Sequence, residues 1–167
     1  FSLDVEAAGI AAVYRTLIMT EFAGQWPAIK SLLAPGGERY IELSMQRQPP
    51  VGLAGYLQAT ATRFGVQRQW AQILATTPPI LGPGFPEPPV VPGLESTGPE
   101  GWELVANAMR LCTATSLVGV PAVAVPTGLV DGLPSGVQVI GQMYREDLCL
   151  EAAEAIELRL GVLTPIG

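Results

Sequence analysis

The residue types that perform most hydrolytic and metal-assisted chemistry are scarce in this sequence of 167 residues. It has no histidine, a single lysine at Lys30, and two cysteines, Cys112 and Cys149. Without histidine the chain cannot form a Ser-His-Asp triad, a Cys-His pair or a histidine-ligated metal site. Two distant cysteines do not make a zinc site, so we expect no metal and no cofactor, and both cysteines are interpreted as core residues.

The remaining candidates for chemistry are a lysine beside a serine and a series of carboxylates. Lys30 precedes Ser31, but no Gly/Ser-rich segment flanks the pair, and we interpret Lys30 as a solvated side chain on a short helix. Glu151, Glu154 and Glu157 could act as paired carboxylates in acid–base catalysis. Their helical spacing beside an apolar stripe instead predicts a solvated helix face.

Charge and hydropathy exclude two classes of partner. The net charge is −6, from 15 acidic and 9 basic residues, so the basic surface that binds nucleic acid is missing. No apolar run approaches the roughly 20 residues that span a bilayer. Asp4 and Glu6 follow Phe1 closely, unlike the basic start of a signal peptide, and the cysteines form no CxxC pair. These features predict a cytoplasmic chain.

The elements expected to position any site are mainly helical in the first 70 residues. Helices are predicted at 4–23, 28–33, 38–47 and 52–70, with Pro35-Gly36-Gly37 as a break before the third. Residues 73–76 are interpreted as a short buried strand. Residues 78–99 contain eight of the sixteen prolines and are expected to form an irregular surface loop.

The final third has a strand–turn–strand–helix pattern. A helix is expected at 102–111, an apolar strand buried on both faces at 120–125, a turn at Asp131-Gly132 and a second strand at 137–140, together making an antiparallel hairpin. A closing helix at 146–160 would bury the stripe Cys149, Ala153, Ile156 and Leu160. Three short strands make a poor sheet alone, so the chain is expected to complete a sheet supplied elsewhere.

Three motifs occur in order within residues 110–148. The segment 110–128 is similar to T-x-x-x-N-x-x-G-x-P-A-x-x-V-P-x-G, with Cys112 in place of the threonine and Ser116 in place of the asparagine. D-G-L-P-x-G-V-Q-x-I-G follows at 131–141, and Glu-Asp-Leu at 146–148. Together they resemble the C-terminal part of the amidase-signature family. Residues 70–77 also resemble that family's Y-D-x-L-L-x-P-T segment, with Ala71 and Thr76 as departures.

The resemblance implies an α/β fold, with a mixed sheet flanked by helices, and amide hydrolysis by a Ser–cis-Ser–Lys triad. The catalytic residues sit in a Gly/Ser-rich signature that precedes the present segment in family members. The chain, which begins at Phe1, is therefore expected to be the C-terminal portion of one amidase domain. Its parts would be a helical flank (1–70), a strand and Pro-rich loop (71–100), and a helix, hairpin and closing helix (101–160).

No residue of this chain is expected to be catalytic, but five could line a substrate pocket. Thr76, Thr77 and Pro78 follow the expected strand, where loops often carry sites. Met109 and Arg110 directly precede the first motif. Ordinary turn chemistry is the alternative for the first three, and Arg110 could pair with an acid or cap a helix end, where a cation suits the dipole.

The expected partners are a small-molecule amide, the N-terminal remainder of the same protein, and a second copy in a homodimer. A non-catalytic assembly module is one alternative. The A subunit of a tRNA-dependent amidotransferase is another, but that branch has an acid just before the first motif and a V-K-R-R-I stretch. Met109-Arg110 and residues 38–47 show neither, which favours a stand-alone amidase.

The residue inventory predicts that the chain alone is inactive. A purified sample should hydrolyse neither a simple aryl amide nor an aliphatic amide, measured as released ammonia or amine. Turnover that co-purifies with the chain through several columns would contradict this. Sequencing the reading frame upstream of Phe1 tests the same expectation, because an amidase parent must encode a Gly/Ser-rich signature and an earlier lysine there.

Overall fold

A computed structural model describes residues 3–161, which divide into two compact units. Unit 1 contains residues up to Val66 together with Val90–Leu117, and unit 2 contains Gln67–Pro89 and the residues from Val118 onward. Helix α4 (Leu53–Leu74) runs through the boundary. Each unit therefore combines segments that lie far apart in the sequence, and each is described below by itself.

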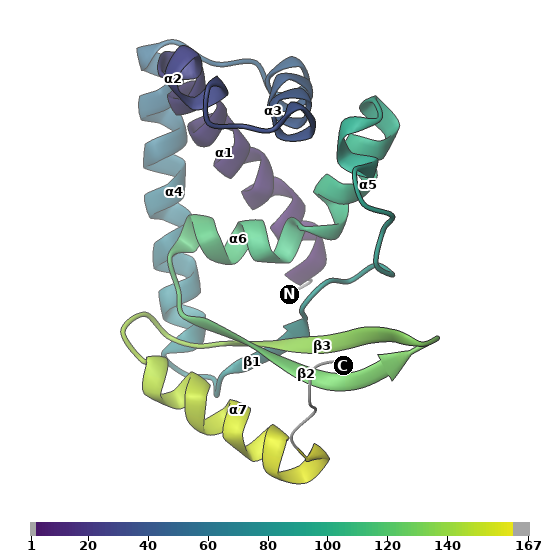
Figure 1. The fold of residues 1–167 in the computed structure, drawn as a ribbon. Coiled ribbons are helices and arrows are strands. Elements are labelled where there is room, and N and C mark those ends of the chain that lie inside the picture. Colours follow the sequence, from purple (N-terminus) through teal and green to yellow (C-terminus); the bar gives the residue numbers. More distant parts are fainter. Residues whose placement is uncertain (1–2, 162–167) are drawn as a thin grey trace. The chain divides into compact units, whose positions relative to one another are not determined.

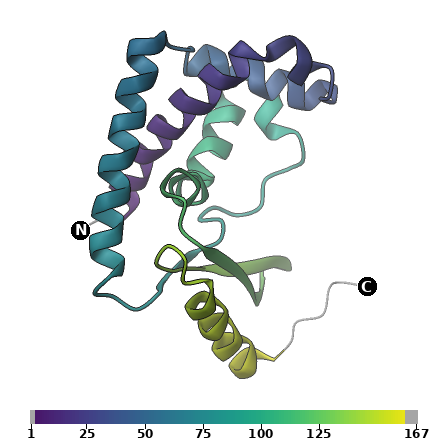
Figure 2. The same ribbon diagram turned by 90° about the vertical axis from the view of Figure 1, so that its left-hand side faces the viewer.

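Unit 1 is helical (Figures 1 and 2). Its elements are α1 (Leu3–Gly24), α2 (Trp26–Lys30), α3 (Pro35–Arg47), the first part of α4, a 3-10 turn η1 (Leu94–Ser96), α5 (Pro99–Ala108) and α6 (Arg110–Val118). Helix α3 packs against α1 and α5. Leu43 and Ala106 are buried with Trp102 where α3 meets α5, and Tyr40 packs against them. The spacing of these residues, three or four apart on each helix, puts them on the facing sides.

Unit 2 is a three-stranded antiparallel sheet with one helix on it. The strand order is β1-β3-β2, with β1 at Ile80–Pro83, β2 at Ala122–Val130 and β3 at Leu133–Ile140. The β2–β3 turn has Asp131 and Gly132 at φ 52° and 79°, as a tight hairpin turn requires. Helix α7 (Glu146–Leu160) covers one face of the sheet (Figure 2), where Cys149 and Ala153 pack against Val125 and Val139.

Several expectations are confirmed, although the ends of some helices and strands differ from those predicted. The α/β class, the first helix, the hairpin and the closing helix are all present. The pair Pro35-Gly36 does not interrupt the third helix but begins it, because proline fits the first helical turn. The predicted short second helix at 28–33 is instead Trp26–Lys30. The single helix expected at 102–111 is two helices, α5 at Pro99–Ala108 and α6 at Arg110–Val118.

Four predictions were wrong. Residues 73–76 are not a strand: Ile73 and Leu74 close α4, and the chain turns there. The strand lies seven residues later, at Ile80–Pro83, inside the segment expected to be irregular; proline is tolerated because β1 is an edge strand. Leu160 is 49% exposed, and β2 is not buried on both faces, since Ala122 and Ala124 are exposed.

The packing of α7 on the sheet predicts a coupled effect of Gly141 and Cys149. A Cβ at Gly141 would overlap Sγ of the fully buried Cys149. Gly141→Ala should therefore lower the free energy of unfolding by about 1–3 kcal/mol, as overpacking does. In a Cys149→Ala background the same change should cost clearly less, because the sulfur is gone. Urea unfolding of the four proteins measures this; equal costs in both backgrounds would show that the clash is relieved elsewhere.

Candidate substrate pocket

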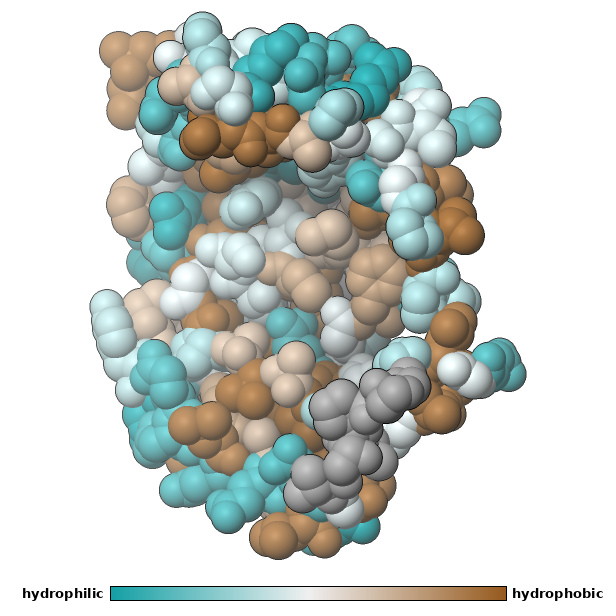
Figure 3. Space-filling view, in the orientation of Figure 1, coloured by the Kyte–Doolittle hydropathy of each residue, from teal (hydrophilic) through white to brown (hydrophobic). Residues whose placement is uncertain are grey.

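Unit 1 contains a hollow of about 230 Å³ between α1, α3, α5 and α6. Figure 3 shows the surface recessed between α3 and α6 on the face presented there. Its walls are largely apolar and aromatic and come from residues on one side of each helix. These residues are Tyr14, Ile18, Met19 and Phe22 of α1, Tyr40 and Ile41 of α3, and Ala106, Met109 and Cys112 of the α5–α6 region.

One end of the hollow carries a buried polar connection. The indole Nε1 of Trp102 donates to Oγ of Ser44 over 2.7 Å, and Ser44 donates in turn to the carbonyl of Tyr40 over 2.8 Å. Ser44 is only 2% exposed, so both hydroxyl bonds are needed there. Arg15 lies with its guanidinium carbon 5.7 Å from the centroid of the Trp102 ring, a cation–π distance.

Burial governs the electrostatics of this end. Desolvation lowers the pKa of Arg15 and raises the pKa of Tyr40. An arginine remains protonated near neutral pH even so, and the phenol of Tyr40 remains neutral. The hollow therefore presents one cation and neutral hydroxyl groups on an apolar wall. Such a lining can hold and orient a small molecule.

A second hollow of about 260 Å³ shares Tyr14, Ile18 and Ser116 with the first, so the two adjoin. Its lining is more polar. Tyr56 donates from its hydroxyl to Glu21 over 2.6 Å, and that hydrogen bond raises the pKa of Tyr56. Arg63 donates through Nε to the carbonyl of Leu117 over 2.9 Å, which ties α4 to the end of α6.

Of the five residues expected to line a pocket, Met109 borders the first hollow and is 41% exposed. Arg110 donates through Nη1 to the carbonyl of Asn107 over 2.7 Å, in the last turn of α5, as a helix-capping cation does. Thr76, Thr77 and Pro78 lie in unit 2 and are exposed. Both threonine hydroxyls donate to the carbonyl of Ile73 and so close α4.

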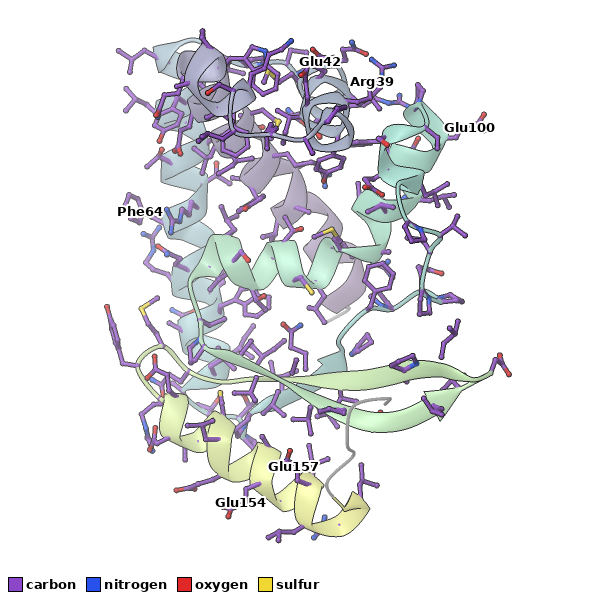
Figure 4. All side chains as sticks on the ribbon, viewed as in Figure 1. Arg39, Glu42, Phe64, Glu100, Glu154 and Glu157 are labelled. Atoms are coloured by element: carbon purple, nitrogen blue, oxygen red, sulfur yellow. The ribbon has the colours of Figure 1, made fainter. Side chains whose placement is uncertain are left out.

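Lys30 has the surroundings of a surface ion pair. Its ammonium is 2.7 Å from Glu38 and 3.5 Å from Glu42, and the bond to Glu38 raises the lysine pKa. A general base needs the opposite shift, toward a neutral amine. Ser31 donates to the carbonyl of Ala28 over 2.7 Å. Glu42 and Arg39 lie along the exposed side of α3 (Figure 4), which agrees with a solvated setting.

The other residues considered for chemistry are three glutamates, two cysteines and a serine. Glu151, Glu154 and Glu157 are exposed on α7, as expected. Cys149 is fully buried, and desolvation raises the pKa of its thiol, so the reactive thiolate is disfavoured. Cys112 is partly buried beside the first hollow. Ser116 donates to the carbonyl of Cys112 over 2.8 Å, one turn back in α6. Among residues 3–161, no cluster of side chains could hold a metal ion.

Sequence reasoning missed most of the lining of the first hollow. Tyr14 and Ile18, like Tyr40 and Ser44, are four residues apart on one helix, a spacing that predicts a shared face. That spacing does not say which helices meet. The meeting of α1, α3 and α5 depends on contacts between residues some 60 positions apart, such as Ser44 and Trp102.

Comparison with known proteins assigns a family. A family model described as Amidase matches residues 4–150. The indoleacetamide hydrolase of Bradyrhizobium japonicum is 39% identical over 112 residues, which are 66% of this chain and 24% of that protein. The A subunit of the glutamyl-tRNA(Gln) amidotransferase of Exiguobacterium sibiricum is 39% identical over 108 residues, or 65% of this chain and 22% of that protein. The matched part thus spans about a quarter of the length of these relatives.

Solved structures agree on the fold. A crystal structure of an amidase superposes with a TM-score of 0.71 at 22% identity, covering 93% of this chain and 36% of that one. The A subunit of the Thermotoga maritima glutamyl-tRNA(Gln) amidotransferase gives 0.59 at 24% identity, covering 90% and 33%. No helix within residues 3–161 has the length and hydropathy needed to cross a membrane.

The buried connection from Trp102 to Ser44 generates a stability prediction. Ser44→Ala removes the acceptor of a buried indole N–H and should lower the free energy of unfolding by about 1–3 kcal/mol. Thr62→Ala is the matched control, because its exposed hydroxyl bonds only to Gln58 in its own helix; it should stay within about 0.5 kcal/mol of the parent. Urea unfolding followed by tryptophan fluorescence measures both. Equal effects would show that the bond to Ser44 stabilises nothing.

Proposed function

This chain belongs to the Amidase family, and from that membership we propose that it is the C-terminal portion of an amide hydrolase whose catalytic residues lie upstream of Phe1. The proposal is supported above all by the ordered motifs of residues 110–148, which fold as α6, the β2–β3 hairpin and the start of α7. The matched relatives extend well beyond the portion this chain covers, which leaves room for a catalytic segment.

The proposed reaction is hydrolysis of a carboxylic amide to an acid and ammonia or an amine. In the Ser–cis-Ser–Lys mechanism a lysine accepts a proton through the bridging serine, the second serine attacks the carbonyl, and backbone N–H groups hold the oxyanion. Lys30 does not fit this role, because Glu38 and Glu42 hold its charged form. This chain would instead contribute binding and positioning.

The hollow of unit 1 is the proposed contribution to substrate binding. Its apolar and aromatic walls, with Met109 and Tyr40 among them, suit an uncharged amide with an aromatic or bulky apolar body. The relative from Bradyrhizobium japonicum is an indoleacetamide hydrolase, whose name describes such an amide. Thr76, Thr77, Pro78 and Arg110 remain proposed pocket residues in the complete protein.

The A subunit of an amidotransferase is the second candidate function, favoured by relatives of that name at similar identity. That branch holds free glutamine with an acidic residue just before the first motif. Met109 occupies this region here and faces the apolar hollow. The stand-alone amidase therefore agrees better with the residues present. If the chain is a non-catalytic module, its parent protein lacks the catalytic serines and lysine. The sequence of the upstream reading frame distinguishes this alternative from an amidase.

A charge placed at Met109 tests the pocket. In the longer protein, Met109→Asp should lower kcat/KM for an aryl acetamide by roughly tenfold or more, mainly through KM, because an apolar substrate would face a desolvated carboxylate. Leu104→Asp is the matched control, since Leu104 is 59% exposed on α5 and does not line the hollow. Equal losses in the two variants would contradict the proposed pocket. If the unaltered longer protein hydrolyses no amide, the proposal that it is a hydrolase is contradicted instead.

A further inference from the structure

The first hollow of unit 1 is lined by one charged side chain, Arg15 of α1. No carboxylate of the residues that the structure describes lies within ion-pair distance of Arg15, whereas Lys30, Arg39 and Arg47 each pair with a glutamate. The Arg15 guanidinium instead faces the ring of Trp102, with 5.7 Å between its carbon and the ring centroid. A cation–π contact uses the charge of a guanidinium but none of its five N–H donors, which stay available to a ligand.

Partial burial prepares Arg15 to bind an anion. The side chain has lost part of its contact with water, and this desolvation lowers its pKa, although the guanidinium stays charged near neutral pH. Less water must therefore be removed from Arg15 when an anion enters the hollow, and desolvation is the main cost of forming an ion pair away from solvent. Hydrogen bonds from a guanidinium to a carboxylate are also roughly twice as strong as those between neutral groups.

Three hydroxyl groups that line the hollow are already engaged as donors. Those of Ser44, Thr113 and Ser116 each donate to a carbonyl one turn back in the same helix. The walls around them are apolar and aromatic, and the volume of about 230 Å³ is below the roughly 300–1,000 Å³ of sites for drug-sized molecules. The hollow therefore suits a small ligand with an aromatic body and one anionic group.

Hydrolysis of a neutral aromatic amide produces a ligand of this kind. Water supplies the hydroxyl group of the acid and a proton of the released amine, and the C–N bond is replaced by a C–O bond. The acid then loses its proton near neutral pH, because the pKa of a carboxyl group is about 4. The aromatic body is the same in substrate and product, so the main change that the hollow meets is a neutral carboxamide replaced by a carboxylate.

We propose that Arg15 makes the first hollow of unit 1 selective for the carboxylate of a small aromatic acid over the corresponding amide. The choice of this ligand rests on the proposed function, because such an acid is the product of the proposed reaction. In the longer protein Arg15 would retain the product, and the acid would compete with the next amide for the hollow. Arg15 acts here as a specificity-determining residue and takes no part in bond cleavage.

Phenylacetate and phenylacetamide are the probes, because they share a ring and a similar shape and differ in charge. Isothermal titration calorimetry on this chain near neutral pH should give a dissociation constant for phenylacetate at least about tenfold below that for phenylacetamide. The net charge of −6 opposes binding of an anion elsewhere on the surface, so nonspecific attraction does not produce this preference. In NMR spectra the side-chain Nε–H signal of Arg15 should shift with phenylacetate and much less with phenylacetamide.

Two variants that each remove one arginine charge complete the test. Arg15→Gln should bring the two dissociation constants to within about threefold of each other, because both ligands then meet a neutral donor. Retained binding of phenylacetamide shows that the hollow persists in this variant. Arg39→Gln is the matched control and should keep the full preference, because Arg39 lies on the exposed side of α3 (Figure 4) and does not line the hollow.

Several outcomes would overturn the proposal. They are equal affinity for the acid and the amide, an Arg15 signal that does not move with phenylacetate, and equal effects of Arg15→Gln and Arg39→Gln. Loss of phenylacetate binding in the longer protein would also overturn it, since Arg15 would then pair with a carboxylate of the remaining chain. None of these results depends on amide turnover. If the longer protein hydrolyses no amide, the proposed function fails while a measured preference for phenylacetate stands.

Discussion

The hydrogen bond from Trp102 to Ser44 is the constraint on which unit 1 depends. It joins α5 to α3 inside the core, where the indole N–H of Trp102 would otherwise lack a partner. The Ser44 hydroxyl accepts from the indole and at the same time donates to the carbonyl of Tyr40, one turn earlier on α3. With α3 and α5 joined, Tyr40 and Met109 border the same hollow. The shape of the proposed pocket therefore depends on the hydrogen bond between a serine and an indole.

Unit 2 depends on an equally small set of contacts. The β2–β3 hairpin presents Val125 and Val139 side by side on one face, and the Cys149 side chain of α7 packs against both. Cysteine is small enough for α7 to approach the sheet closely, and Gly141 has no side chain to obstruct it. The motif residues Asp131-Gly132 and Gly141 are thus explained by backbone geometry and close packing, and none of them needs a role in catalysis.

Short sequence patterns predicted the elements whose formation depends on residues close together in the chain. The tight turn at Asp131-Gly132 and the acids that begin α7 led to the hairpin and the closing helix. The strand at Ile80–Pro83 was missed because its proline argued against pairing, and only its edge position, opposite Val137–Ile140, makes that proline acceptable. The hollow of unit 1 was missed for a related reason. Helical spacing identifies faces, whereas the choice of which faces meet is made by contacts distant in the sequence, such as Arg15 with Trp102.

Only 14% of the residues are charged. Apolar side chains on the surface, as well as those in the core, account for this low content. Large apolar side chains are exposed in both units, among them Leu53 and Phe64 on α4 and Leu129 and Val130 beside the hairpin turn. Exposed apolar side chains gathered on one element commonly mark a contact surface. The chain aligns with about a third of a solved amidase, so such a contact surface would be in keeping with its partial coverage of that fold. The scarcity of catalytic residue types and the excess of apolar surface both agree with the function proposed above, in which this chain positions and encloses a site.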